Sequence, residues 1–257
     1  AGYTGVFAIN GTCFLLSALS EVFIRFPQQE FSRAQGRGAQ LQAYTENFRQ
    51  GLAYVWQHGN LRTLIGYGVA LNFIATPVFD IVMPFFGKEV LQMSPESFGL
   101  VKSTLPVGLL VGTLLVGFLS QRVPKEKLLV RAIVGQGFAG VFIGVIALPA
   151  FYGQLSMPAL LGCLVLPVFS IGLLNVMVNV PIQVMLQETV PDAYRGRVFG
   201  LLDCLFSILV PVSMAVFGPA VDIVPPFVFF LGCSGAIIAI GALMRRSPNV
   251  AQLYSAS

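Results

Sequence analysis

Seven long apolar runs constrain the fold of this chain more than any other feature of its sequence. They lie at about residues 3–26, 63–86, 98–120, 130–150, 158–186, 198–220 and 227–244. A helix needs about 20 mostly apolar residues to cross the hydrocarbon core of a bilayer, and the runs have that length. Only 10% of the residues are charged, whereas a soluble domain has about a quarter. The sequence therefore predicts an all-α membrane protein with seven transmembrane helices.

The basic residues between the runs predict the orientation of the chain. Thirteen of the 15 Lys and Arg residues lie in the tail or near the segments that join runs one and two, three and four, and five and six. The other two are Lys88 and Lys102. Cytoplasmic loops of membrane proteins carry an excess of basic residues. We therefore expect a multi-pass plasma-membrane protein with a cytoplasmic C-terminus and an outside N-terminus.

The start of the chain does not have the pattern of a signal peptide. The first run has no basic region before it and continues directly into Glu21 and Arg25. Together with the outside N-terminus and the absence of an initiator Met, this predicts a piece of a longer protein. An odd number of helices would then come before the first run.

The segment between the first two runs changes character along its length. It is polar and rich in glycine at first, and then its apolar residues step by three and four positions: Leu41, Tyr44, Phe48, Leu52 and Val55. This spacing predicts a helix on the cytoplasmic surface of the membrane with Trp56 at the interface. A contact with another helix would use the same spacing. His58, at the end of this helix, is interpreted as a surface residue rather than part of a proton relay.

Polar residues recur along one helical face within three of the runs. These faces consist of Asn72, Thr76 and Asp80 in the second run, Asn175, Asn179 and Gln183 in the fifth, and Asn10, Ser17 and Glu21 in the first. Polar groups are costly in hydrocarbon, so we expect all three faces to point into the bundle. The first two sets are candidates for lining a substrate path, and hydrogen bonds between helices are the alternative use.

Asp80 and Lys102 lie at similar distances from the outer ends of neighbouring runs. At a rise of about 1.5 Å per residue, both are about 6–9 Å deep. Adjacent antiparallel helices would bring them together, so we hypothesise an Asp80–Lys102 ion pair near an outer gate.

Three acidic residues within or at the ends of the runs are candidates for proton coupling: Asp80, Asp203 and Glu21. Two of them have an alternative use. Asp203 would contact the basic turn that precedes its run, and Glu21 would pair with Arg25, four residues further on.

Glycine pairs at Gly108/Gly112 and Gly140/Gly144 have the small-xxx-small spacing. This spacing lets transmembrane helices pack closely, because no side chain separates the two backbones. We expect each pair to face a neighbouring helix.

Two polar turns interrupt the apolar runs on the predicted cytoplasmic side. They are "GFLSQRVPKEKLL" (117–129) and "QETVPDAYRGRVFG" (187–200). In the second turn, Arg195 and Arg197 flank Gly196, so two guanidinium groups lie near helix ends. They would cap helix carbonyls or bind a carboxylate such as Glu188 or Asp192. A role in gating and a role as an anchor for membrane topology both remain open.

These two turns resemble the major facilitator superfamily. The first is similar to the family's Gly-x-Leu-x-Asp-Arg-x-Gly-Arg-Lys loop, with Gln121 in place of Asp and Pro124 in place of the second Gly. The second resembles a Gln-x-x-Val-Pro-x-x-x-Arg-Gly-Arg-Val turn of the macrolide-efflux and enterobactin-exporter group, and "FAINGTCFLLSAL" in the first run resembles the sixth helix of that group. The loop residues to which the resemblance gives a gating role are Gly117, Arg122, Lys125, Lys127, Gln187, Arg195, Gly196 and Arg197.

The resemblance implies that the seven runs are helices 6–12 of a 12-helix transporter. Residues 1–26 would be the last helix of a missing N-terminal bundle, 27–62 a cytoplasmic linker with an amphipathic helix, 63–244 a C-terminal six-helix bundle and 245–257 a cytoplasmic tail. The implied function is secondary active transport: proton-coupled export of small amphipathic organic molecules, such as drugs or siderophores, by alternating access. Lipid or lysophospholipid transport is the alternative within the family. The implied partners are a small-molecule substrate, protons, membrane lipids and the missing bundle.

The sequence lacks the residues that other classes of function need. No GxxxxGK[ST] loop is present, so ATP drive is not expected, and one His with scattered acids does not make an enzyme site. A seven-helix receptor or photoreceptor shares the topology, but the last run has no Lys for retinal. The four Cys residues lie in apolar runs without CxxC spacing and are interpreted as small buried side chains. We expect no cofactor, no metal and no nucleic-acid partner.

Overall fold

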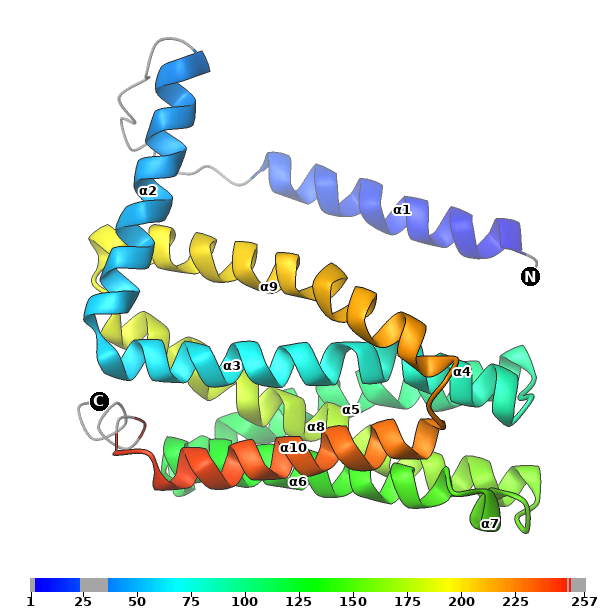
Figure 1. Ribbon diagram of the computed structural model, residues 1–257. Helices are drawn as coiled ribbons and strands as arrows, with labels where there is room; N and C mark the ends of the chain where they lie inside the picture. The colour runs from blue at the N-terminus through cyan, green and yellow to red at the C-terminus, as the bar shows by residue number, and fades with distance from the viewer. Residues whose placement is uncertain (1–2, 24–36, 249, 251–257) are drawn as a thin grey trace. The chain divides into compact units, whose positions relative to one another are not determined.

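The computed structural model of the chain describes residues 3–23, 37–248 and 250. The chain divides into two compact units, Ala1–Thr45 and Glu46–Ser257. The first unit contains α1 (Tyr3–Val22) and the start of α2 (Arg37–Gln57). The second contains the end of α2 and then α3 (Gly59–Pro77), η1 (Val78–Val82), α4 (Met83–Phe85), η2 (Phe86–Val90), α5 (Pro95–Arg122), α6 (Lys125–Ile146), α7 (Pro149–Tyr152), α8 (Met157–Thr189), α9 (Asp192–Val221) and α10 (Pro226–Arg246) (Figure 1).

Seven helical stretches in the described part of the chain are long and apolar enough to cross a membrane. They are Thr4–Val22, Gly59–Val90, Pro95–Arg122, Lys125–Ile146, Met157–Thr189, Asp192–Val221 and Pro226–Arg246. Each corresponds to one of the predicted apolar runs. The prediction of an all-α membrane protein with seven transmembrane helices is confirmed.

Prolines mark where three of these helices begin. Pro95, Pro158 and Pro226 each lie in the first turn of a helix, where the missing N–H group would have had no partner within the helix. Ser94 caps α5, because its hydroxyl oxygen accepts a hydrogen bond from the Ser97 N–H at 3.2 Å. These proline and serine residues therefore set the point at which the next helix begins after a short connection.

The stretch from residue 59 to residue 90 is one continuous helix with two π-helical segments. Segments η1 and η2 flank the single turn of α4. Pro84, in α4, has no N–H to donate to the Asp80 carbonyl four residues earlier. The wider π turn of η1 accommodates this missing hydrogen bond. Asp80 therefore lies on a segment whose side chains do not follow the spacing of an α-helix, and such segments are frequent at functional sites.

Glycines bring two pairs of helices into close contact. A Cβ atom on Gly112 of α5 would lie 2.6 Å from the Leu173 carbonyl oxygen of α8. A Cβ atom on Gly144 of α6 would lie 2.7 Å from the Leu231 Cδ2 atom of α10. Gly108 and Gly140 leave equally little room, against Phe169 and Ser234. The predicted role of both glycine pairs in close helix packing is confirmed.

The buried apolar side chains form three clusters along the bundle. One cluster, around Phe86, Leu164 and Phe230, lies toward η2 and the short helix α7. The second, around Leu129 and Met185, lies toward the turns that precede α6 and follow α8. The third joins the end of α2 to α3, α8 and α9. Side chains of the first two clusters line a pocket inside the bundle.

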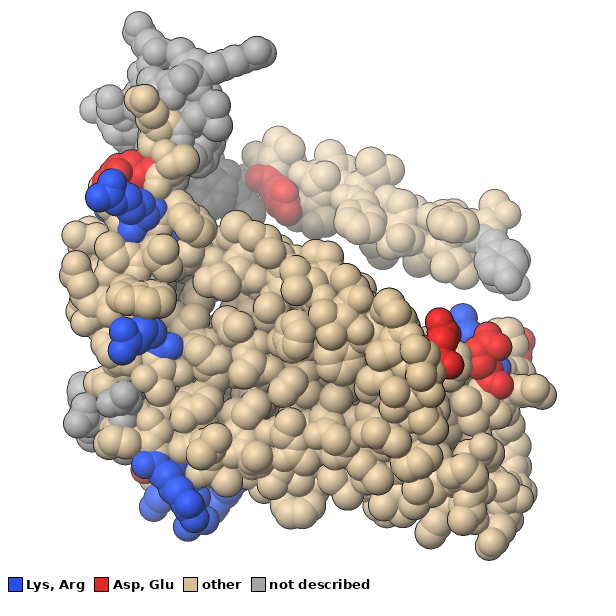
Figure 2. All heavy atoms as spheres, in the orientation of Figure 1, with Lys and Arg blue, Asp and Glu red and all other residues tan. Residues whose placement is uncertain are grey.

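The two ends of the six-helix bundle differ in charge (Figure 2). Basic side chains gather at the end where the α5–α6 and α8–α9 turns lie, and a group of acidic side chains lies at the opposite end, near η2. The bundle thus has the uneven distribution of Lys and Arg on which the predicted orientation depends. Which end faces the cytoplasm stays a prediction.

Candidate functional site

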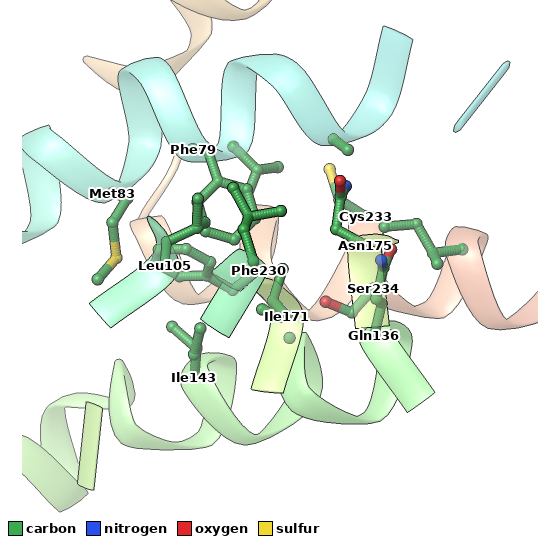
Figure 3. A pocket seen from close by; sticks show the side chains of 15 residues that line it. Phe79, Met83, Leu105, Gln136, Ile143, Ile171, Asn175, Phe230, Cys233 and Ser234 are labelled. Carbon is green, nitrogen blue, oxygen red and sulfur yellow. The ribbon is translucent and has the colours of Figure 1, made fainter. Parts of the chain in front are cut away.

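A pocket of about 780 Å³ lies inside the six-helix bundle, counting the space at its open side. Figure 3 shows its lining, which comes from the 59–90 stretch and from α5, α6, α8 and α10. The lining residues are Ala75, Val78, Phe79, Met83, Leu105, Leu109, Gln136, Gly140, Ile143, Ile171, Asn175, Phe230, Cys233, Ser234 and Ile237. We call this space the bundle pocket.

The polar residues of the bundle pocket lie at one end of it. Gln136, Asn175, Cys233 and Ser234 are grouped there, apart from Phe79 and the apolar side chains around it (Figure 3). The glycines of α6 create this arrangement, because a Cβ atom on Gly140 would collide with the Ser234 hydroxyl. The close approach of α10 to α6 therefore places Ser234 near the polar end.

Two amides at the polar end differ in their hydrogen bonds. The Oδ1 atom of Asn175 accepts a hydrogen bond from the Asn179 Nδ2 group at 2.9 Å. The Nε2 atom of Gln136 is buried and has no hydrogen-bond partner in the described structure. A buried amide without a partner is unusual in a protein, because its desolvation is not compensated.

A second pocket of about 790 Å³ adjoins the bundle pocket and is lined by Asp80 and Lys102. Both side chains are exposed, and they do not form an ion pair. The hypothesis of an Asp80–Lys102 pair is therefore wrong for this structure. It assumed a regular α-helix, whereas Asp80 lies in the π-helical segment η1, which changes the direction of its side chain.

The predicted substrate-path residues divide between these spaces. Asn175 lines the bundle pocket, and Asp80 lines the second pocket. The Thr76 hydroxyl donates to the Asn72 Oδ1 atom at 3.3 Å, and neither residue lines either pocket. Asn179 and Gln183 are exposed on α8, along the helix from Asn175.

Gln136 and Ser234 are lining residues that the sequence analysis missed. Each is an isolated polar residue in an apolar run, without a second polar residue four positions away to form a stripe. A search for single amides within apolar runs would have found Gln136. Nothing in the sequence pattern distinguishes Ser234 from other small residues of its run.

The α8–α9 turn is held by Arg195. Its Nη2 group donates to the Gln187 carbonyl oxygen at 2.9 Å and lies 2.7 Å from the Asp192 carboxylate. The Nε atom of Arg195 is buried and has no partner among the described residues. This arginine thus does both things that the sequence analysis considered: it caps a helix carbonyl and binds a carboxylate.

Glu188 pairs with a lysine rather than with an arginine of its own turn. The Lys125 Nζ atom lies 3.0 Å and 3.1 Å from the two carboxylate oxygens of Glu188. This contact joins the start of α6 to the end of α8, and so connects the two turns that the family resemblance singled out. The Arg122 guanidinium lies 4.2 Å from the ring centroid of Phe118, and Lys127 is exposed. Around Gly117, a Cβ atom would meet open space.

The end of α2 packs against the start of α9. A Cβ atom on Gly51 would lie 2.8 Å from the Arg197 carbonyl oxygen, and the Arg197 Nε group donates to the Asn47 Oδ1 atom at 3.0 Å. Val55 is buried in the cluster that contains Val198. This half of α2 therefore makes the contact with other helices that the sequence analysis left as an alternative.

Aromatic rings extend the contact between α2 and α9. Tyr54 stacks on Tyr194 with ring centroids 4.9 Å apart, and on His58 at 4.2 Å. Burial, and to a lesser extent the neighbouring Tyr194, raises the pKa of the Tyr54 hydroxyl above its usual value. The exposed His58 ring is also 2.8 Å from the Tyr54 carbonyl oxygen through Nδ1.

The apolar face predicted for the α2 helix is buried only in part. Trp56 is exposed, as are Phe48 and Leu52. The side chains of Leu41 and Tyr44 lie outside the described ones.

Two interpretations of single acidic residues have different outcomes. Asp203 is exposed and forms no ion pair with Arg195 or Arg197, so its expected contact with the basic turn is wrong. It lies more than one helical turn beyond both arginines, whose donors bind closer partners. Glu21 is exposed on α1, and its expected partner Arg25 lies outside the described residues.

The four cysteines are free, but they are not all buried. Cys163 and Cys233 are partly buried, whereas Cys13 and Cys204 are exposed on the protein surface. The expectation of burial is therefore wrong for the last two, because an apolar run in a membrane protein also supplies the side chains that face outward.

Comparison with known proteins identifies a family and several relatives. A family model described as Major Facilitator Superfamily matches residues 1–214. The chain is 24% identical over 229 residues to the multidrug efflux pump Tap of Mycolicibacterium fortuitum, covering 89% of this chain and 52% of that protein. It is 25% identical over 246 residues to the multidrug efflux pump Tap of Mycobacterium tuberculosis, covering 95% of this chain and 54% of that protein.

A further relative is macrolide efflux protein A of Enterococcus faecalis. The chain is 22% identical to it over 218 residues, which cover 81% of this chain and 60% of that protein. The chain spans about half the length of the Tap proteins that it matches. No solved structure gives a significant match.

Proposed function

The chain belongs to the Major Facilitator Superfamily, and we propose that it exports small amphipathic organic molecules by secondary active transport. Members of this family are transporters and not enzymes, and several relatives of the chain are efflux proteins. The family assignment removes the alternative of a seven-helix receptor. Drugs and macrolides are the first substrates to test, because the relatives are named for them. Siderophores and lysophospholipids come second, since only the sequence resemblance suggests them.

The observation that carries the proposal is the bundle pocket. It combines a large apolar wall with a few polar groups, which is the usual composition of a site for small organic ligands. Its polar end includes Asn175, one of the residues predicted from the α8 stripe. In the proposed mechanism, Asn179 and Gln183 continue this path along α8, and Asn72, Thr76 and Asp80 line it on the 59–90 stretch.

Alternating access would require this bundle to move against a second bundle of helices. The basic turns supply contacts that such a motion can break and remake: the Lys125–Glu188 pair, and the bonds from Arg195 to Gln187 and Asp192. We place this end of the bundle in the cytoplasm, together with the C-terminus. Gly196 and Gly117, where a Cβ atom would meet open space, leave room for another surface to approach.

Proton exchange is proposed as the source of energy. Asp80, Asp203 and Glu21 are the candidate carboxylates. Asp80 is the strongest of the three, because it lines a pocket next to the bundle pocket and has no ion-pair partner in the described structure.

An efflux assay tests the proposal. The complete gene is expressed in a pump-deficient bacterial strain, and the accumulation of a macrolide, a cationic dye and a siderophore is measured with and without a proton uncoupler. We expect lower accumulation of at least one compound, reversed by the uncoupler. Accumulation equal to that of the empty vector for every compound, with the protein present in the membrane, would contradict the proposal. Reduced accumulation that the uncoupler does not change would reject the proton step alone.

A further inference from the structure

The bundle pocket has a lining without charge. None of the side chains that line it is acidic, basic or a histidine. The charged side chains of Asp80 and Lys102 line the adjoining pocket instead. A charged ligand in the bundle pocket would lose its hydration without a counter-charge, which is unfavourable. The pocket therefore selects for neutral molecules.

The polar end of the pocket presents hydrogen-bond donors. The Gln136 Nε2 group is buried and has no hydrogen-bond partner in the described part of the chain. The neighbouring Asn175 accepts a bond through its Oδ1 atom, and its exposed side chain leaves the amide nitrogen available as a second donor. Two amide nitrogens favour a ligand that carries a hydrogen-bond acceptor, such as the oxygen of a ketone, an amide or a lactone.

The other side of the pocket suits aromatic rings. Phe79 and Phe230 lie there with Met83 and Leu105 around them (Figure 3). Aromatic side chains pack favourably edge to face or offset against another ring, and a methionine sulfur makes favourable contacts with a ring edge. A ligand with an acceptor at one end and a ring at the other would match both sides.

We propose that the bundle pocket binds neutral aromatic molecules with a carbonyl group, and that Gln136 donates to that carbonyl through Nε2. This inference rests on the proposed function for its meaning in transport, but the binding itself is independent of transport. It assigns Gln136 as the residue that distinguishes ligands with an acceptor from those without one. An acceptor on the ligand would remove the unfavourable state of a buried donor that has no partner.

Two probes of nearly the same shape test this assignment. Benzophenone has a carbonyl between its two rings, and diphenylmethane has a methylene group in the same place. Their affinities for the purified 257-residue chain in lipid nanodiscs are compared by titration calorimetry. We expect benzophenone to bind about five- to tenfold more tightly, which corresponds to one net hydrogen bond.

A matched pair of variants locates the difference. Gln136→Met keeps the length of the side chain and removes the donor, so it should bring the two affinities within about twofold of each other by weakening benzophenone alone. Gln57→Met makes the same change at an exposed position of α2 that does not line the pocket, and should keep the preference. Equal affinities in the unaltered chain, or a preference that survives in Gln136→Met, would overturn the assignment.

A second measurement does not depend on the folding of a variant. Benzophenone forms covalent adducts with nearby C–H groups under ultraviolet light, and mass spectrometry of the unaltered chain identifies the labelled peptides. Adducts on peptides that contain Met83, Ile143 or Phe230 support the site, whereas adducts confined to residues outside the pocket contradict it. Binding with this preference but without efflux would leave the site standing and reject the proposed function. Efflux without this preference would support the proposed function and reject the binding site.

Discussion

Arg195 and Arg197 lie two positions apart and hold different parts of the molecule. Arg195 binds within its own turn, to Gln187 and Asp192. Arg197 reaches Asn47 on α2 and lies 5.7 Å from the ring centroid of Tyr194. The Asp192 side chain is 88% exposed, so its ion pair with Arg195 contributes little to stability. Arg195 therefore stabilises the α8–α9 turn mainly through its hydrogen bond to the Gln187 carbonyl oxygen.

Gly51 tests whether α2 depends on its contact with α9. In an exposed helix, alanine is more stable than glycine by up to about 1 kcal/mol. At position 51, however, a Cβ atom would lie 2.8 Å from the Arg197 carbonyl oxygen, and overpacking of this kind costs about 1–3 kcal/mol. We expect Gly51→Ala to weaken the docking of α2 and to change the fluorescence of Trp56, the one tryptophan of the chain.

Gly66→Ala is the control for this substitution, because a Cβ atom there has nothing within 4 Å. It should leave the Trp56 emission unchanged and should not lower the melting temperature. A Trp56 spectrum that is the same in Gly51→Ala as in the unaltered chain would show that α2 docks without this close approach.

Asp80 and Lys102 give a second test at the level of single residues. Because they share a pocket without forming an ion pair, the changes in unfolding free energy of Asp80→Asn and Lys102→Gln should add. We expect the double variant to match the sum of the single variants within about 0.5 kcal/mol, measured by denaturant unfolding in detergent. A coupling above about 1 kcal/mol would mean that the pair forms in solution.

Among the elements, α5 and α8 show how far sequence reasoning reaches. The spacing of Gly108 and Gly112 predicts a close contact, and the structure has it. The partner helix does not follow from the spacing. Gly172 of α8, which faces the Leu105 carbonyl, completes the same interface but belongs to no glycine pair in the sequence.

The 59–90 stretch shows the limit of periodicity. The prediction that Asn72, Thr76 and Asp80 share one face assumes a regular α-helix. It is correct for Asn72 and Thr76, which lie four positions apart and form a hydrogen bond. It fails at Asp80, because η1 is π-helical. Pro84 is visible in the sequence as a point of disturbance, but a proline can also produce a simple kink, so the π turn could not be predicted.

Gly112→Ala tests the interface between α5 and α8. The new methyl group would lie 2.6 Å from the Leu173 carbonyl oxygen, which belongs to the backbone and cannot rotate away. We expect a loss of about 1–3 kcal/mol in stability, seen as a lower melting temperature and less monodisperse protein in size-exclusion chromatography.

Gly117→Ala, on the same helix, is the matched control, because a Cβ atom there meets open space. It should behave like the unaltered chain or be slightly more stable. If both variants melt at the same temperature, the close approach of α5 and α8 does not limit stability.

At the scale of the whole molecule, the length and apolar composition of the runs predicted the number of membrane-spanning helices, whereas the orientation that the charges predict stays a prediction. Seven apolar runs gave seven membrane-spanning helices, because bilayer thickness leaves few alternatives for an apolar segment of this length. The pocket could not be predicted in the same way. Its lining combines five helical stretches, and which side chains meet there depends on how the glycines bring those helices together.

Labelling of single cysteines tests the orientation of the bundle. In a background without the four natural cysteines, Ala193→Cys lies in the exposed first turn of α9 and Ile223→Cys in the α9–α10 connection. If the basic end faces the cytoplasm, a membrane-impermeant maleimide should label position 223 in intact cells and position 193 only after permeabilisation. The opposite pattern would reverse the proposed topology.

The bundle pocket and the pocket of Asp80 and Lys102 have Phe79, Met83 and Leu105 in common. These three side chains therefore contact both spaces, one with an uncharged lining and one that contains Asp80 and Lys102. A ligand in the bundle pocket that moves any of them would also change the space around the Asp80 carboxylate, so the two pockets would be coupled without a distant relay.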